Sequence, residues 1–355
     1  MDRHVRALDI LKQGAVIPAT PLALDERRKF DEKVQRLLIR YYLDCGVGGI
    51  ATAVHTTQFE IRQPEVGLFE PVLKLVAEEI DAYEEKTGKT IVRIAGACGP
   101  VEQAVAEAKL AKQYGYDAVL LSPGGLNAFS ERDLIERTKA VAEIMPVIGF
   151  YLQEAVGGRV FTYNYWEQVA AIDNVVAIKC ASFNRYQTLD VVRAVACSPR
   201  REDITLYTGN DDNIVIDLLT KFEFRNELGD VVCKEFKGGL LGHWTLWTKK
   251  VVELFEQVTE AKKHDTIDAS LLTIAAQITD ANAAFFDPAH KFRGCIPGVH
   301  EVLRRQGLMK GTWCLNEEET MSQGQAEEIT RVTNSYPWLC DDEFVKANLD
   351  KWFEQ

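Results

Sequence analysis

The stretch from Val175 to Ser182 reads VVAIKCAS and carries one charged residue, Lys179, at the end of a short apolar run. The run is rich in β-branched residues and follows Asp173-Asn174, a pattern typical of a buried parallel strand. Burial disfavours the ammonium form, so a lysine here is unfavourable unless it is paired or used. A neutral amine can attack a ketone and form a Schiff base. Two interpretations follow: a catalytic lysine, or a lysine paired with a carboxylate at the strand mouth.

Strand-like and helix-like segments alternate on both sides of this stretch. The strand-like segments are residues 14–21, 48–54, 90–97, 118–123, 146–152, 175–182, 204–208 and 238–242. Each precedes a segment with apolar residues at helical spacing, at 31–45, 64–85, 100–114, 130–143, 162–172, 186–196, 213–222 and 244–263. Eight strand–helix units in unbroken alternation predict an α/β fold of the (β/α)8 TIM-barrel type, with a doubly wound sheet as the alternative.

Two parts of the chain lie outside this alternation. Residues 223–237 are charged, and we expect an inserted loop there. Beyond about residue 265 the pattern indicates further helices, among them Leu271–Phe286 and Val299–Arg305, and no strand. The chain is therefore expected to contain a catalytic barrel over residues 1–264 and a C-terminal helical extension over 265–355, which packs on the barrel or on a partner subunit.

The composition argues against several classes of function. The 355-residue chain has a net charge of −12 and a pI of about 5.2, which argues against nucleic-acid and anionic-membrane partners. Its apolar runs are all shorter than the roughly 18 residues of a membrane span, and the N-terminus lacks the apolar segment of a signal peptide. The eight cysteines form no CxxC pair, so we expect no zinc site, and their scatter suits reduced thiols in a cytoplasmic protein.

The reactive side chains of such a barrel are expected at the C-terminal ends of the strands. Side chains alternate along a strand, which places Lys179 on the same face as Ala177, and Tyr151 on the same face as Gly149. We therefore expect Lys179 and Tyr151 to be close neighbours on adjacent strands, with the phenol as a proton shuttle. The alternative for Tyr151 is a tyrosine packed under a loop.

Two further strand ends carry polar residues. Thr56 and Thr57 follow the second strand, where hydroxyl and backbone N–H groups can hold a carboxylate; simple turn capping is the alternative. Gly209 and Asn210 follow the seventh strand, where a glycine lets the backbone approach a substrate. For Asn210 the alternative is the N-cap of the next helix.

Five short motifs together resemble the dihydrodipicolinate synthase / N-acetylneuraminate lyase family. They are PATP at 18–21, HTT at 55–57, FY at 150–151, IK at 178–179 and TGND at 208–211, in the family's order. The resemblance extends from about residue 12 to about residue 310. It implies a (β/α)8 barrel, commonly a homotetramer, that forms a Schiff base with pyruvate or a related 2-oxo acid. It implies no metal and no organic cofactor.

By this resemblance, Lys179 is the Schiff-base lysine and Tyr151 is the proton shuttle. Thr56 and Thr57 look like the pair that holds the carboxylate of the 2-oxo acid, and Thr57 also relays protons. The expected partner is a small-molecule 2-oxo acid, and the expected assembly is a homo-oligomer, either a tetramer or a dimer.

The chain also departs from the family pattern. Many relatives have Gly-Thr-Thr-Gly-Glu after strand two, whereas residues 55–60 here read HTTQFE. Gly124-Gly125 stand where the lysine-biosynthesis members have aromatic residues, and Arg159 comes later than their substrate-binding arginine. These differences argue against dihydrodipicolinate synthase itself. Candidates for contacts with a polar substrate, each with the alternative of a packing or surface role, are His55, Gln58, Gln153, His243 and Trp244.

Three functions remain open at this point. The first is an aldolase that cleaves or forms a C–C bond through the imine on Lys179. The second is a dehydratase that acts on a 2-keto-3-deoxy sugar acid through the same imine. The third is a barrel that binds 2-oxo acids without turnover. A phosphate-binding barrel enzyme is disfavoured because the sequence shows no strong glycine-rich phosphate loop.

Overall fold

The computed structural model describes residues 2–354 and confirms the predicted fold class. Eight parallel strands form a nearly closed barrel with helices between them, a (β/α)8 TIM barrel, and helices follow at the C-terminal end. The chain divides into two compact units, which are described in turn. The first contains the N-terminal residues up to Ala15 together with Val92–Leu240, and the second contains Val16–Ile91 and the residues from Leu241 onward.

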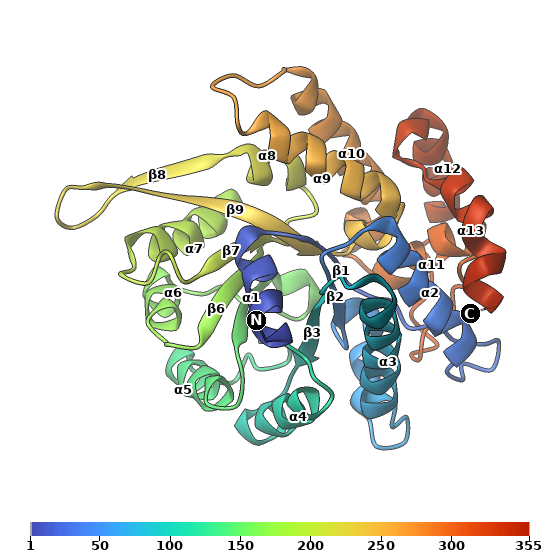
Figure 1. The fold of residues 1–355 in the computed structure, drawn as a ribbon, viewed down its shortest axis with the longest axis horizontal. Helices are drawn as coiled ribbons and strands as arrows, with labels where there is room; N and C mark the ends of the chain where they lie inside the picture. Colours follow the sequence, from blue (N-terminus) through green and yellow to red (C-terminus); the bar gives the residue numbers. More distant parts are fainter. Residues whose placement is uncertain (1, 355) are drawn as a thin grey trace. The chain divides into compact units, whose positions relative to one another are not determined.

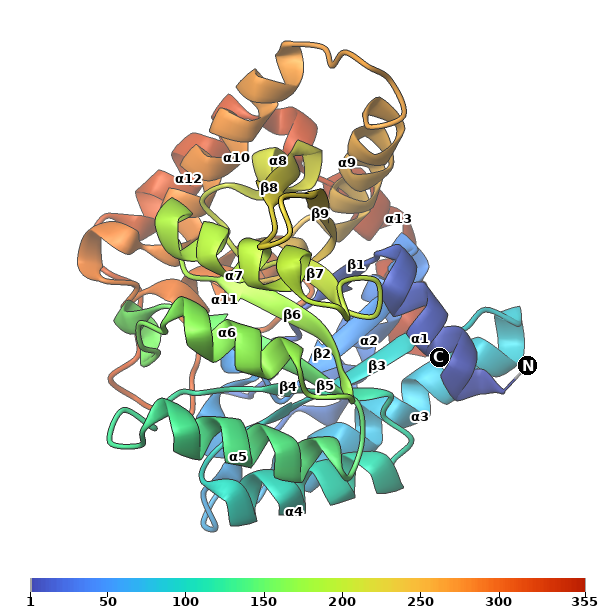
Figure 2. The same ribbon diagram turned by 90° about the vertical axis from the view of Figure 1, so that its left-hand side faces the viewer.

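The first unit consists of parallel strands that alternate with helices. Its elements are α1 (Arg3–Gln13), β3 (Val92–Ala97), α4 (Val101–Gln113), β4 (Ala118–Leu121), α5 (Glu131–Ala142), β5 (Val147–Leu152), η3 (Glu154–Val156), α6 (Tyr163–Ala170), β6 (Val175–Ala181), α7 (Arg185–Cys197), β7 (Thr205–Thr208), α8 (Ile214–Leu219), β8 (Lys221–Arg225) and β9 (Val231–Leu241). The parallel strands follow the order β3-β4-β5-β6-β7-β9. Helices α4, α5, α6 and α7 flank these strands one after another (Figure 2).

Helix α1 was not predicted. It begins after Asp2 and buries Ala7 and Leu11, which lie four residues apart and so share one helix face. The hydroxyl of Tyr207 on β7 donates a hydrogen bond to the Leu11 carbonyl over 2.7 Å. Arg3 also contacts the buried carboxylate of Asp117 over 2.6 Å. Tertiary contacts with β7 and with Asp117 therefore hold this helix.

The expected loop at residues 223–237 is wrong. Strands β8 and β9 pair there as an antiparallel hairpin, which extends as a two-stranded arm (Figure 1). On β8 the half-buried Phe222 and Phe224 alternate with exposed charged residues, a period of two that is characteristic of a strand. Gly229 has a φ of 84° in the connecting turn, a conformation that glycine adopts readily.

The second unit contains the first two barrel strands and the C-terminal helices. Its elements are β1 (Val16–Pro18), α2 (Glu32–Cys45), β2 (Gly49–Thr52), η1 (His55–Thr57), η2 (Phe59–Arg62), α3 (Phe69–Thr87), η4 (His243–Thr245), α9 (Thr248–Ala261), α10 (Ser270–Phe286), η5 (Pro288–His290), α11 (Cys295–Arg305), α12 (Gln325–Ser335), η6 (Pro337–Leu339) and α13 (Asp342–Glu354). A parallel bridge joins Ala19 to Ala51, just beyond β1 and within β2.

The helices of the second unit form two groups. Helix α10 packs on α11 and α12, and α2 packs on α3, α9 and α13. The helix predicted over residues 64–85 begins later, at Phe69, because two short 3₁₀ turns follow β2 first. Within residues 2–354, every helix is too short or too polar to cross a membrane. The division into a barrel over 1–264 and an extension over 265–355 stays a prediction.

Candidate active site

Lys179 lies in the C-terminal half of β6 and is only 8% exposed. Burial lowers the pKa of its amine from 10.5 to about 8, and the negative charge of Asp211 opposes this change. The ammonium lies over the ring of Phe150, with Nζ 4.4 Å from the ring centroid. An amine with this pKa is partly neutral at neutral pH, which is the form that attacks a carbonyl carbon.

Gly209, directly after β7, makes room for the Lys179 side chain. A Cβ atom at Gly209 would lie 2.6 Å from Cε of Lys179 and 2.9 Å from Cβ of Ala181. The Gly209 backbone is held in place because its N–H donates to the Cys180 carbonyl over 2.7 Å. The missing side chain therefore lets the backbone approach Lys179, while the expected approach of Gly209 to a substrate stays a prediction.

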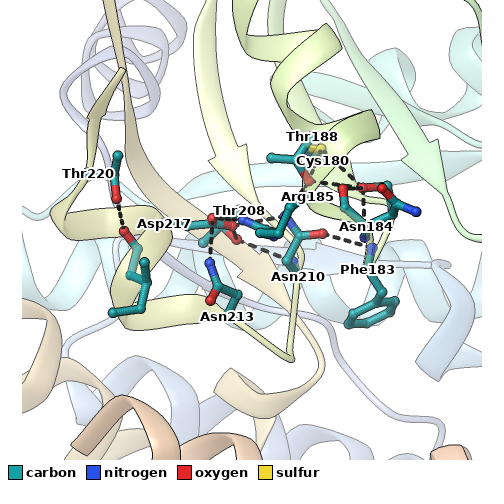
Figure 3. Close-up of polar contacts among 12 residues, drawn as sticks. Cys180, Phe183, Asn184, Arg185, Thr188, Thr208, Asn210, Asn213, Asp217 and Thr220 are labelled. Carbon is teal, nitrogen blue, oxygen red and sulfur yellow. Dashed lines mark hydrogen bonds and ion pairs between the residues drawn. The ribbon is translucent and has the colours of Figure 1, made fainter. Parts of the chain in front are cut away.

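Asn210 belongs to a buried polar network around Asp217 (Figure 3). Its Nδ2 donates to Asp217 over 2.9 Å, and its Oδ1 accepts the N–H of Phe183 over 3.0 Å. The Thr208 hydroxyl donates to the same carboxylate over 2.7 Å. The Asn210 side chain bonds within the protein, and the contact of this residue with a substrate stays a prediction. The network fixes the loop that carries Gly209.

The predicted pairing of Tyr151 with Lys179 is wrong. The register between β5 and β6 shifts after Val147, so that Val176 is passed over and Phe150 stands opposite Lys179. Tyr151 stands opposite Cys180 instead. One extra residue on β6 is enough to exchange the two faces, because side chains alternate with a period of two.

Tyr151 points toward the layer of α6. Its ring stacks on Trp166 with centroids 5.4 Å apart, and its oxygen accepts the N–H of Phe161 over 3.2 Å. A Cβ at Gly149, two residues earlier on the same face, would also contact Trp166. Burial raises the pKa of the Tyr151 phenol to about 12. The alternative role, a tyrosine packed in the protein, describes it better than that of a proton shuttle beside the amine.

Thr56 and Thr57 lie in the 3₁₀ turn that follows β2, and both are buried. The Thr56 hydroxyl donates to the Ala19 carbonyl over 2.7 Å, and the Thr57 hydroxyl donates to the Thr20 carbonyl over 2.7 Å. Thr245, in the turn after β9, donates to the same Ala19 carbonyl over 2.8 Å. The second unit thus gathers three buried threonine hydroxyls, from η1 and η4, around the carbonyls of Ala19 and Thr20.

His243 begins this last turn and is 1% exposed. Its Nδ1 lies 2.6 Å from Oδ1 of Asn282 on α10, a contact that assigns the ring proton to Nδ1. Burial lowers the pKa of His243 to about 4, so the imidazole is neutral near pH 7. The neighbouring Trp244 packs edge-on against Phe255. His243 is therefore a neutral, oriented group at a strand end, whereas Trp244 is a packing residue.

Comparison with known proteins shows the family of this chain. A sequence model of the dihydrodipicolinate synthetase family matches residues 12–221, more than half of the chain. The chain belongs to the dihydrodipicolinate synthetase family. It is 26% identical over 207 residues to an N-acetylneuraminate lyase of Citrobacter koseri, a match that covers 58% of this chain and 65% of that protein. It is 31% identical over 134 residues to a 4-hydroxy-tetrahydrodipicolinate synthase of Acetivibrio thermocellus, covering 37% and 43%.

This family member therefore matches less than two thirds of the length of these curated relatives. A crystal structure of dihydrodipicolinate synthase from Oceanobacillus iheyensis superposes with a TM-score of 0.73 over 95% of this chain and 99% of that one. The identity of that pair is 15%, so this likeness concerns the fold. The matched region of the family model includes Thr56, Thr57, Lys179 and Gly209.

The sequence did not reveal two groups that surround the amine of this family member. In the sequence, Phe150 stands out only as the neighbour of Tyr151, and Asp211 only as part of the TGND motif. No sequence signal identifies the bulge that turns Phe150 toward Lys179, because β5 and β6 are almost entirely buried and apolar on both faces. Among residues 2–354, no group of three or more His, Cys, Asp or Glu side chains is arranged to hold a metal ion.

Proposed function

We propose that this protein is a class I lyase of the aldolase type. Lys179 would form a Schiff base with a pyruvate-derived 2-oxo acid, through which a C–C bond is cleaved or formed. The observation that carries the proposal is the buried amine of Lys179, with a pKa of about 8, at the C-terminal end of a barrel strand. Gly209 supports it, because the missing side chain leaves the space that the lysine occupies.

In the proposed reaction, the neutral Nζ attacks the C2 carbonyl, and the carbinolamine loses water to give an iminium. A base removes the proton of the C4 hydroxyl, and the electrons of the C3–C4 bond move toward the iminium nitrogen. An aldehyde leaves, and an enamine remains on the lysine. Protonation at C3 and hydrolysis then release pyruvate and restore the amine. The iminium serves as the electron sink throughout.

Thr56 and Thr57 are proposed to hold the carboxylate of the 2-oxo acid. Thr57 is also proposed as a proton relay, because its oxygen accepts the Val54 N–H while its proton goes to the Thr20 carbonyl. Tyr151 is given no part in proton transfer, since its phenol lies on the other face of β5. Gly209 acts by its lack of a side chain, next to the amine.

Reductive trapping tests the proposal. The protein is incubated with pyruvate and borohydride, and the adduct is located by intact mass and peptide mapping. We expect one adduct on Lys179 that is absent in Lys179→Ala. Lys234→Ala is the matched control, because burial also lowers the pKa of the β9 residue Lys234 to about 8. No adduct with pyruvate or with a panel of other 2-oxo acids would remove the proposed chemistry.

Products then separate the two reactions that share the imine. Pyruvate plus an aldehyde from a 4-hydroxy-2-oxo acid identifies an aldolase. A single dehydrated oxo acid from a 2-keto-3-deoxy sugar acid identifies a dehydratase instead. Adducts without any product would indicate a barrel that binds 2-oxo acids without turnover. A cytoplasmic location and a homo-oligomeric assembly remain predictions drawn from the sequence and the resemblance.

A further inference from the structure

The hairpin of β8 and β9 leaves one edge of β8 open. Among residues 2–354, β8 pairs with β9 alone, from Lys221 opposite Glu235 to Arg225 opposite Val231. The match to the family model ends at Lys221, so nearly all of the hairpin lies beyond it. An open strand edge presents a row of N–H and C=O groups to which another strand can add. The free edge of β8, the side away from β9, is therefore a candidate interaction surface.

The turn of the hairpin shows which backbone groups point to the free edge. The N–H of Asn226 donates to the Asp230 carbonyl over 3.0 Å, and these two residues form a hydrogen-bonded pair of the antiparallel ladder. Hydrogen-bonded pairs alternate with pairs that lack hydrogen bonds, so the backbone groups of the even-numbered residues of β8 face β9. The backbone groups that face the free edge belong to the odd-numbered residues, which are Lys221, Glu223 and Arg225.

The hairpin extends beyond α7 as an arm of only two strands (Figure 1). A two-stranded ribbon on its own is marginally stable in water, whereas three or more strands with an apolar face are stable. Near the base of the arm, Phe222 packs edge-on against Phe236 with ring centroids 6.0 Å apart. Near its tip, Leu228 is 85% exposed and Val231 is 56% exposed. Strands added at the free edge would widen the ribbon and bring a partner alongside this tip.

The charges on the free edge fit a second copy of the same strand. The exposed side chains of its three residues alternate in sign, from Lys221 through Glu223 to Arg225. If two β8 strands ran antiparallel with Glu223 opposite itself, like charges would face each other at every pair. A shift by one hydrogen-bonded pair places Glu223 opposite Arg225 of the partner subunit, and the two-fold axis repeats this contact. The same odd-numbered residues then make the backbone hydrogen bonds, so backbone and side chains favour one register.

We propose that two copies of this chain associate through the free edges of β8, so that their two hairpins form one four-stranded antiparallel sheet centred on Phe224. A shift in the other direction would pair Lys221 with the partner subunit's Glu223. The register with Arg225 is favoured because a guanidinium can bind a carboxylate through two hydrogen bonds. It also places the two-fold axis farther from α8, which ends at Leu219. This assembly surface does not depend on the chemistry proposed for Lys179.

Charge reversal tests the register. Glu223→Arg and Arg225→Glu each place like charges opposite each other twice per dimer, and each should weaken subunit association by about tenfold or more, measured by sedimentation velocity over a range of concentrations. The double variant, which exchanges the two charges, should return to within about threefold of the wild type. Glu136→Arg is the matched control, because Glu136 is 60% exposed and pairs with Lys139 over 2.9 Å, while Glu223 is 55% exposed and pairs with Lys221 over 3.1 Å.

A disulfide at the two-fold axis gives a second measurement that is independent of other contacts between subunits. In the proposed register Phe224 lies opposite Phe224 of the partner subunit in a pair without hydrogen bonds, with Cα atoms about 4.5 Å apart, which suits a disulfide. Phe224→Cys should therefore give a cross-linked dimer on oxidation, detected by non-reducing electrophoresis. Phe222→Cys is the matched control, because Phe222 is half-buried on the same face of β8, but its two copies would lie roughly 14 Å apart.

The wild-type protein, oxidised in the same way, gives the background of the native cysteines. Cross-linking of Phe222→Cys but not of Phe224→Cys would overturn the register. A wild-type protein that is monomeric at every concentration would overturn the association itself. The same conclusion would follow if the charge variants assembled like the wild type and neither cysteine variant cross-linked.

Discussion

Imine formation at Lys179 should reach half of its maximal rate near pH 8, because the neutral amine is the attacking form and burial lowers its pKa to about 8. At pH 7, about 10% of such an amine is neutral, compared with about 0.03% of a lysine with the ordinary pKa of 10.5. From pH 7 to pH 9 the rate should therefore rise about tenfold and then level off. An ordinary lysine would rise about a hundredfold over the same range and continue to rise.

The assay is trapping by cyanoborohydride in excess over subsaturating pyruvate, with the adduct quantified by intact mass between pH 6 and pH 10. Asp211→Asn provides a second arm. The charge of Asp211 raises the pKa of Lys179, so removing it should move the half-maximal rate to lower pH. A rate that increases tenfold per pH unit through pH 9, or a midpoint that moves upward in Asp211→Asn, would refute the assignment of Lys179 as a buried, partly neutral amine.

Three further predictions follow from the same contacts. Gly209→Ala places a Cβ 2.6 Å from Cε of Lys179 and should slow trapping by about tenfold or more. Gly149→Ala, where the new Cβ would make contacts of 3.4 Å or longer, should not slow it. Equal effects of the two variants would contradict the conclusion that Gly209 makes room for the lysine. Tyr151→Phe should leave the trapping rate within about twofold of the wild type and lower the free energy of unfolding by about 1 kcal/mol, as measured by urea unfolding; abolished trapping would refute the placement of Tyr151 on the face of β5 away from Lys179. Phe150→Leu should move the pH midpoint of trapping to lower pH, because it removes the ring beneath the ammonium. Lys179→Met should raise the free energy of unfolding, measured by urea unfolding, by as much as about 3 kcal/mol at pH 7, because the folded state disfavours the ammonium. This difference from the wild type should be constant below pH 8 and shrink toward pH 10.5. A difference that does not depend on pH would exclude this cause.

Much of the barrel was predictable because its signal is local and repeated. The run before Lys179 has the length, the β-branched residues and the boundaries of a buried strand, and β6 spans Val175–Ala181. The capping box of Ser130 and Asp133 likewise marks the start of α5, which begins at Glu131. Such features depend on neighbours in sequence. The C-terminal end of β6, and with it the candidate nucleophile, was therefore identified without knowledge of the tertiary structure.

The partners of the site were less predictable, because they depend on register and on distant residues. The bulge at Val176 leaves no trace in a strand that is buried on both faces, so simple alternation paired Tyr151 rather than Phe150 with the lysine. The role of Asn210 depends on Asp217, a fully buried carboxylate on α8. The hairpin of β8 and β9, in contrast, was predictable from the sequence, because Phe222 and Phe224 alternate with charged residues as in a strand.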